Sequence, residues 1–322
     1  MPLNIHILKK LSLPLSLISL FAAMLLFPAP VLRGASRGLL LWFNTVLPTL
    51  LPFILICNLL IATNSIHLLL HITGPVFCRF FGVSPYGSFA VLAGFLCGYP
   101  MGAKVTADLY RQGNITKKEA SYLLAFCNNT SPMFILSFLV MQNLKDNRLK
   151  LPTLAILFLS PVIISFACRP SRRRSAKVSV GTSLFSGKAQ TASAASSLSD
   201  ALDFSIGNAL EAITKVGVYI MIFAVFAELA ALLPASDTPL GFLFLSSLEI
   251  TNGITMLCQS ETSRKLLYIL CLSETAFGGL CAAAQTASML KGTDISVCSY
   301  LIKKLATALV TSLLAAFYLY LF

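Results

Sequence analysis

Residues 94–104 read Gly-Phe-Leu-Cys-Gly-Tyr-Pro-Met-Gly-Ala-Lys, and this stretch decides how the chain is interpreted. Its glycines and proline interrupt an apolar run, and a basic residue stands just past the interruption. A broken helix inside a bilayer is tolerated only where protein or water satisfies the freed backbone groups. We therefore predict a hairpin tip that binds an anion; a plain tight turn, with Lys104 reaching the headgroups, is the alternative. The residues assigned to this site are Gly98, Tyr99, Pro100, Gly102 and Lys104.

Outward from this stretch, the chain is dominated by apolar residues. Of its 322 residues, 57% are hydrophobic and only 11% are charged, against about 25% charged in ordinary soluble domains. The apolar residues fall in blocks at 11–27, 39–61, 151–168, 216–233 and 305–322. Each block approaches or exceeds the ~20 residues that cross the hydrocarbon as a helix. We therefore expect an all-α polytopic protein of the lipid bilayer.

The first apolar block raises the question of a signal peptide, because it follows Lys9 and Lys10. Its length, and the prolines at 28 and 30, favour a retained first helix. The net charge of +12 would suit nucleic acid, but the basic residues lie mostly in short loops beside apolar blocks, as the positive-inside rule predicts. We expect no nucleic-acid partner.

Residues 169–202 form a basic stretch rich in Ser, Ala and Thr, without an apolar period. Such composition predicts a cytoplasmic linker. The predicted divisions are an N-terminal transmembrane helix (1–37), a first repeat (38–168), this linker, and a second repeat (203–322).

The two repeats carry matching interruptions. Those of the first half lie at 98–104 and 127–132, and those of the second at 248–253 and 273–279. Matching breaks are offset by about 150 residues, which one duplication explains. The basic loops place the two copies in opposite orientations, so we expect an inverted repeat with two re-entrant helical hairpins, the arrangement that marks binding sites in transporters.

Polar residues at these breaks are the further site candidates. Four adjacent polar residues are costly at mid-span unless they are bonded, so we interpret Asn128, Asn129, Thr130 and Ser131 as substrate or ion contacts, with interhelical hydrogen bonding as the alternative.

Acids inside a bilayer are functional candidates as well. Glu249 and Glu274 are predicted to couple transport to a proton or cation, and Thr251 and Asn252, beside Glu249, to bind the solute. For Glu249 the alternative is a structural carboxylate bonded to a helix terminus.

Enzyme chemistry finds little support in the sequence. It contains no metalloprotease, phosphate-loop or dinucleotide-binding motif. Nine scattered cysteines form no CxxC pair, and only three histidines exist. We expect no catalysis, no metal site and no cofactor.

A family resemblance emerges from these motifs. The chain resembles the sporulation integral membrane protein YlbJ family, also called stage V sporulation protein V. In the first half the resemblance lies in the Leu-Trp and Leu-Pro residues within 41–53, in residues 94–104 and in residues 126–132. Residues 248–253 and Gly278-Gly279 with Gln285 match its second half. The resemblance extends from about residue 38 to 322 and is most specific in the Gly-Tyr-Pro and Asn-Asn-Thr-Ser-Pro blocks.

The resemblance implies a nucleoside-transporter gate domain, and hence a fold similar to concentrative nucleoside transporters. It implies residence in the outer forespore membrane of a sporulating bacterium. It also implies transport of dipicolinic acid, a planar pyridine dianion, from the mother cell toward the forespore. Half-helix N-termini at 98–102 and at Gly278 and Gly279, with the amides of Asn128, Asn129 and Asn252, would suit its two carboxylates.

Two other functions remain open at this stage. A scaffold for spore-envelope assembly would need no transport, although it would give no reason for the polar breaks. A nucleoside carrier differs in substrate alone. Carriers of this kind often associate, so a homo-oligomer is a further expectation.

Overall fold

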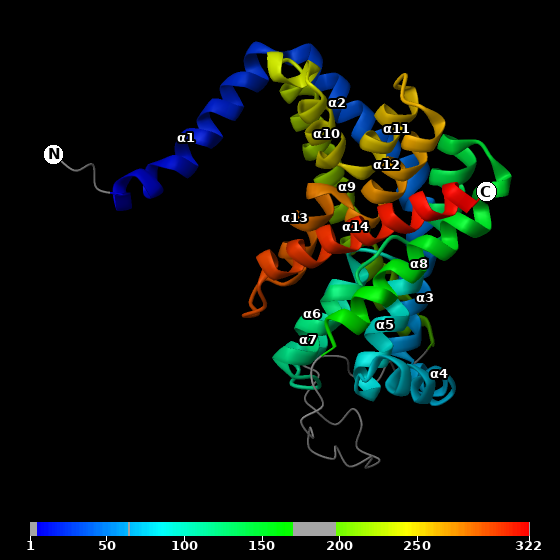
Figure 1. Cartoon of the computed structure of the whole chain (residues 1–322). Helices are drawn as coiled ribbons and strands as arrows, with labels where there is room; N and C mark the ends of the chain where they lie inside the picture. Colours follow the sequence, from blue (N-terminus) through cyan, green and yellow to red (C-terminus); the bar gives the residue numbers. More distant parts are fainter. Residues whose placement is uncertain (1–4, 64, 170–197, 322) are drawn as a thin grey trace.

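The computed structural model describes residues 5–63, 65–169 and 198–321, and its regular structure in those ranges is entirely helical (Figure 1). Five stretches are long and apolar enough to cross a membrane: Pro28–Leu60, Asn147–Ala167, Leu198–Ala230, Arg264–Met289 and Val297–Leu321. The expectation of an all-α polytopic membrane protein is confirmed. Of the predicted linker, residues 170–197 lie outside the described ranges, and residues 198–202 already belong to a helix.

The first half of the chain ends with the helix before residue 170. Its elements are α1 (Ile5–Leu26), α2 (Pro28–Leu41), the π-helical turn η1 (Trp42–Val46), α3 (Leu47–Ala62), α4 (Ile66–Phe81), α5 (Pro85–Cys97), α6 (Met101–Arg111), α7 (Lys117–Phe126), the π-helical η2 (Phe134–Leu144), the 3-10 turn η3 (Asn147–Leu149) and α8 (Lys150–Ala167).

The second half repeats this order of short and long elements. It comprises α9 (Leu198–Ala230), the 3-10 turn η4 (Pro234–Asp237), α10 (Pro239–Leu248), α11 (Ile250–Gln259), α12 (Arg264–Phe277), α13 (Gly279–Met289) and α14 (Val297–Leu321). The chain is interrupted between α5 and α6 and between α10 and α11, and in both halves a second interrupted pair and one long helix follow. That these pairs are re-entrant hairpins stays a prediction. The opposite orientation of the halves stays a prediction.

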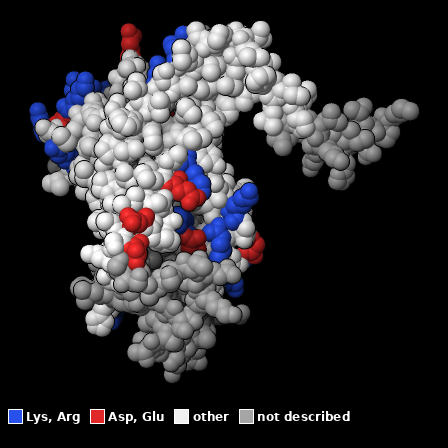
Figure 2. Space-filling model, turned by 180° about the vertical axis from the view of Figure 1, so that it is seen from behind, with Lys and Arg blue, Asp and Glu red and all other residues white. Residues whose placement is uncertain are grey.

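The helix α1 projects from the rest of the molecule (Figure 1). Between Pro14 and Leu26 most of its side chains are apolar and exposed, with Leu15 at 65% and Leu26 at 73% of their full accessible area. On the face drawn in Figure 2, uncharged side chains likewise cover most of the described surface, and charges gather in a few groups. Surfaces of this composition suit contact with lipid.

The helix α2 packs along α9 through two glycines one helical turn apart. A Cβ atom at Gly34 would lie 2.8 Å from the carbonyl oxygen of Ala224, and one at Gly38 would lie 2.8 Å from the Cα atom of Met221. Small residues four apart allow this close approach between membrane helices. Residues 34–38 also match the Gly-x-Ser-x-Gly pattern of serine hydrolases, but that pattern requires a strand-to-helix turn, whereas here it lies inside a helix.

Salt bridges beside this contact also join α2 to α9. The guanidinium groups of Arg33 and Arg37 lie 3.5 and 2.7 Å from the carboxylate of Glu228 on α9. Both arginines lie within a helical stretch that runs from Pro28 to Leu60. The boundary predicted at residue 37 falls inside this stretch.

The end of α7 is inserted between α5 and α6. A Cβ atom at Gly94 would lie 1.6 Å from the Cys127 carbonyl oxygen, and one at Gly102 would lie 2.1 Å from the same atom. Only glycine leaves room for this carbonyl on either side. The two glycines thus fix where the first two interruptions meet.

We expect Gly94→Ala to lower the free energy of unfolding by about 2–4 kcal/mol, because the new methyl group would displace a backbone carbonyl. Gly207→Ala is the matched control, since a Cβ atom there meets nothing within 4 Å. Thermal unfolding of both variants in detergent checks the prediction. Equal melting temperatures for the two would contradict it.

Candidate functional site

The four interrupted regions predicted from the sequence meet at the centre of the molecule. The backbone N–H of Tyr99 donates to the carbonyl oxygen of Asn129, 2.7 Å away. The hydroxyl of Thr130 donates to the carbonyl oxygen of Thr275 on α12, 2.8 Å away. A Cβ atom at Gly278 would contact the Tyr99 ring at 3.3 Å. The breaks of the two halves therefore complete one another's hydrogen bonding.

A cavity of about 430 Å³, including its opening, lies at this meeting point. Its polar lining comes from both halves, while α3, η2 and α9 supply apolar walls. The lining residues drawn from the interruptions and from α13 are Tyr99, Thr130, Ser131, Glu249, Ile250, Thr251, Gly278, Cys281, Ala282 and Gln285.

Two polar atoms of the lining are buried without a hydrogen-bond partner. They are the hydroxyl oxygen of Tyr99 and the Oε1 atom of Gln285. Buried polar groups are normally satisfied, so these two atoms are available to hydrogen-bond a polar ligand. Gln285 is 3% exposed, and its Nε2 atom reaches only the sulfur of Cys281, at 3.3 Å.

Glu249 occupies the break between α10 and α11 and is 1% exposed. Its carboxylate accepts hydrogen bonds from the backbone N–H groups of Thr251 and Asn252, at 3.1 and 2.9 Å. The Asn252 side-chain amide, at 3.0 Å, and the Thr251 hydroxyl also donate to it. Glu249 therefore caps α11, as the structural alternative expected, and it also lines the cavity.

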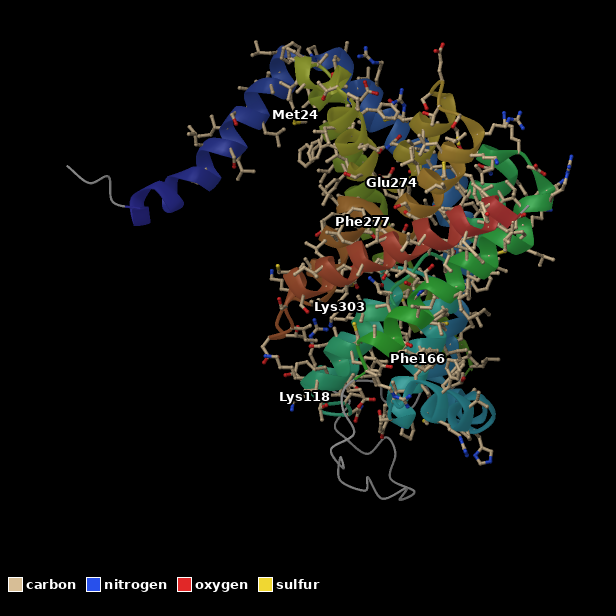
Figure 3. The ribbon with its side chains drawn as sticks, in the orientation of Figure 1. Met24, Lys118, Phe166, Glu274, Phe277 and Lys303 are labelled. Carbon is tan, nitrogen blue, oxygen red and sulfur yellow. The ribbon has the colours of Figure 1, made fainter. Side chains whose placement is uncertain are left out.

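Glu274, the other acid predicted to couple an ion, lies on α12 next to α10 (Figure 3). Its Oε1 atom accepts a hydrogen bond from the Ser246 hydroxyl at 3.3 Å, and its Oε2 atom is buried without a partner. It does not line the cavity. Gly279, the first residue of α13, lies near the break between α10 and α11, since a Cβ atom there would lie 3.3 Å from the backbone nitrogen of Ile250.

Asn128 is completely buried and joins three helices. Its Oδ1 atom accepts from the backbone N–H of Ala103 on α6 at 3.2 Å. Its Nδ2 atom donates to the hydroxyls of Thr286 and Tyr300, on α13 and α14, at 2.9 and 3.0 Å. The geometry is that of the interhelical alternative, and the cavity wall does not include this residue.

The neighbouring Asn129 contacts a residue that sequence reasoning missed. Its Nδ2 atom donates to the Phe126 carbonyl oxygen. Its Oδ1 atom accepts from the ammonium of Lys304 on α14 at 3.4 Å, and Lys304 also donates to the Asn128 carbonyl oxygen at 3.2 Å. The sequence feature that could have identified Lys304 is its place in an apolar helix, seven positions after Val297.

Lys104 lies away from the cavity. Its ammonium pairs with Asp108 one turn further along α6, at 3.0 Å, and both side chains are more than a third exposed. The lysine is thus a surface cation in this structure. Gly98, Pro100 and Gly102 shape the turn and its packing against the 127–132 break, and they too are outside the cavity wall.

Hydrogen bonds and an ion pair also join residues 110–117 of the first half to residues 289–294 of the second. Arg111 donates to the Met289 carbonyl oxygen at 2.6 Å. The carboxylate of Asp294 accepts from the Lys117 ammonium and the Tyr110 hydroxyl, both at 2.7 Å. The hydrogen bond from Lys117 is the main reason that the pKa of Asp294 lies below its usual value.

Metal chemistry has no evident site in the part of the chain that the structure describes. There, no three His, Cys, Asp or Glu side chains lie close enough to hold an ion. The nine cysteines are free thiols.

Together, the spanning helices and the interruptions define a multi-pass membrane protein with a partly polar cavity at its centre. The chain is 24% identical over 313 residues to Sporulation integral membrane protein YlbJ of Bacillus subtilis (strain 168), covering 89% of this chain and 77% of that protein. This similarity confirms the family resemblance indicated by the Gly98 and Asn128 motifs. No family model matches the sequence, and no solved structure matches it.

Asn128→Ala should lower the free energy of unfolding by about 2–4 kcal/mol even without solute, because it leaves the partners on α6, α13 and α14 unsatisfied. The control is Asn114→Ala, whose side-chain bond to Gln112 lies at the surface. Melting curves of solute-free protein test this. A normal melting temperature combined with lost solute binding would instead make Asn128 a ligand contact.

Proposed function

We propose that this protein carries a small polar anion across a bilayer, and that the anion is dipicolinic acid, moved from the mother cell toward the forespore across the outer forespore membrane. The observation that carries the proposal is the central cavity, in which Tyr99 and Gln285 present unpartnered polar atoms between the two halves. The similarity to an integral membrane protein of sporulation supports the biological setting.

The helix ends around the cavity support an anionic solute. Three half-helices begin there, and two of them already bond a side-chain oxygen: Asn128 at α6 and Glu249 at α11. No described side chain caps α13, whose first residues follow Gly278 at the cavity wall. The N-terminal end of a helix attracts carboxylates. We infer that one carboxylate of the solute binds there and that the Tyr99 hydroxyl donates to it.

The carrier mechanism rests on the paired interruptions. We propose that α5/α6 and α10/α11 are re-entrant hairpins of an inverted repeat, similar to those of concentrative nucleoside transporters. The hydrogen bonds between the halves would then exchange as the cavity opens to one side and then the other. A homo-oligomer would be compatible with this arrangement.

Uptake of labelled dipicolinate into proteoliposomes tests the function. We expect saturable uptake, and we expect Tyr99→Phe to reduce it about tenfold while the melting temperature is kept, because the substitution removes the hydroxyl that would donate to the solute and keeps the buried ring. Tyr268→Phe is the control, since the Tyr268 hydroxyl lies 3.0 Å from that of Thr153 and outside the cavity.

The contradicting outcomes separate the alternatives. Uptake of uridine with no uptake of dipicolinate would indicate a nucleoside carrier. No uptake of either solute by folded protein would favour the scaffold.

Glu249 gives a second test, because its carboxylate and the dianionic solute share one cavity. Because like charges repel, we expect the solute to bind together with a proton on Glu249. Uptake should then fall as the pH rises, by up to about tenfold per pH unit for one linked proton. Glu249→Gln should flatten this profile. Glu211→Gln, at a surface pair with Lys215, should leave it unchanged. A pH profile of uptake that is the same in all three proteins would exclude Glu249 as the coupling group.

A further inference from the structure

Lys304 is the sole lysine or arginine that the described part of the chain buries fully, at 1% exposure. It lies on α14, and none of the ion pairs formed by the described residues includes it. Its two hydrogen-bond acceptors are neutral oxygens, the carbonyl of Asn128 and the side-chain amide of Asn129. A buried charge without an acid is unusual, because buried charges are normally paired.

The surroundings of the ammonium nevertheless suit a cation. The two oxygens follow directly after α7, which ends at Phe126. The C-terminal end of a helix carries partial negative charge, and its last carbonyl groups lack intrahelical partners. The side chain of Asn129 is also oriented for this role, because its Nδ2 atom donates to the Phe126 carbonyl and so leaves Oδ1 facing Lys304.

Carbonyl and amide oxygens at an unwound helix are the ligands by which carriers bind Na⁺. Hard cations in general take such oxygen ligands. Here the same kind of oxygen set is bonded to an ammonium group that belongs to the chain itself. The position that a free cation would take is therefore filled by a covalently attached one.

We propose that the Lys304 ammonium is a tethered cation that replaces a coupling Na⁺ at the 127–132 break, so that the protein binds and moves its solute without Na⁺. The transport part rests on the proposed function, whereas the occupation of the cation position does not. The adjacent Lys303 has no such role: it is partly buried, and its ammonium donates to the Ser121 carbonyl oxygen at 2.9 Å (Figure 3).

Thermal unfolding of the purified full chain, without solute, in equal concentrations of sodium, potassium or choline chloride tests the occupation. We expect the melting temperature of the wild type to be the same in all three salts, and likewise that of Lys303→Ala. Lys304→Ala should melt lower in choline and be raised by sodium by about 2–4 °C, because a free ion can then bind the oxygens. Lys304→Met should also melt at a lower temperature than the wild type, but sodium should not raise that temperature, because the methionine side chain fills the space that the ion would take.

Three results would overturn the proposal: selective stabilisation of the wild type by sodium, a folded Lys304→Ala variant that responds to sodium no more than to choline, or an equal sodium response in Lys304→Met. If Lys304→Ala does not fold, stabilisation of the wild type or of Lys304→Met by sodium over choline would still overturn the proposal.

The transport part has its own readout, which is wild-type uptake with choline in place of sodium. Undiminished uptake is expected, and uptake that requires sodium would contradict the tethered cation. If the wild type takes up no dipicolinate at all, the proposed function fails, while the melting experiments still decide whether Lys304 occupies the cation position.

Discussion

The rest of the structure depends on one constraint: backbone groups released where helices break inside an apolar protein must find partners. Four interruptions meet at the centre and are satisfied partly by one another and partly by local bonds. Tyr99 donates to Asn129 across the first two breaks, and Thr130 donates to Thr275 across the two halves, whereas Glu249 caps the helix that follows it. The long-range bonds tie the position of each of these breaks to that of its partner.

The same constraint separates residues that hold the centre together from residues that face the cavity. Asn128 uses both protons of its amide on other helices, so it has nothing left to donate to a ligand. Tyr99 and Gln285 have unused polar atoms in the cavity wall. A site built in this way keeps its shape when it is empty, because its supporting bonds are distinct from those it offers to a solute.

The positions of the breaks could be predicted from the sequence, because glycine, proline and clustered polar residues interrupt a helix within an apolar run. The direction of each side chain could not. Asn128 and Asn129 were grouped with Thr130 and Ser131, yet only the latter two reach the cavity, since consecutive residues of a turn point in different directions. The pairing of Arg33 and Arg37 could not be predicted either, because their partner, Glu228, lies far along the chain.

The lysines show the same limit. Lys104 beside a break was the obvious candidate, and Lys304 was overlooked within the last apolar segment. The two lysines differ in burial. Lys104 pairs with Asp108 at the surface, whereas Lys304 is buried against the C-terminal end of α7. A lysine in an apolar helix is ambiguous in sequence, because reaching outward to headgroups and turning inward to carbonyls require the same residue type.

The place of α14 in the chain has a consequence for biosynthesis. This helix, near residue 300 and beyond, supplies both Tyr300 and Lys304 to a break formed by residues near 128. While the ribosome is still making the second half, Asn128 and Asn129 are already in the membrane and lack these partners. The contacts that Asn128 and Asn129 make with Tyr300 and Lys304 can therefore form only after α14 has been synthesised, so the centre of the first half is completed late.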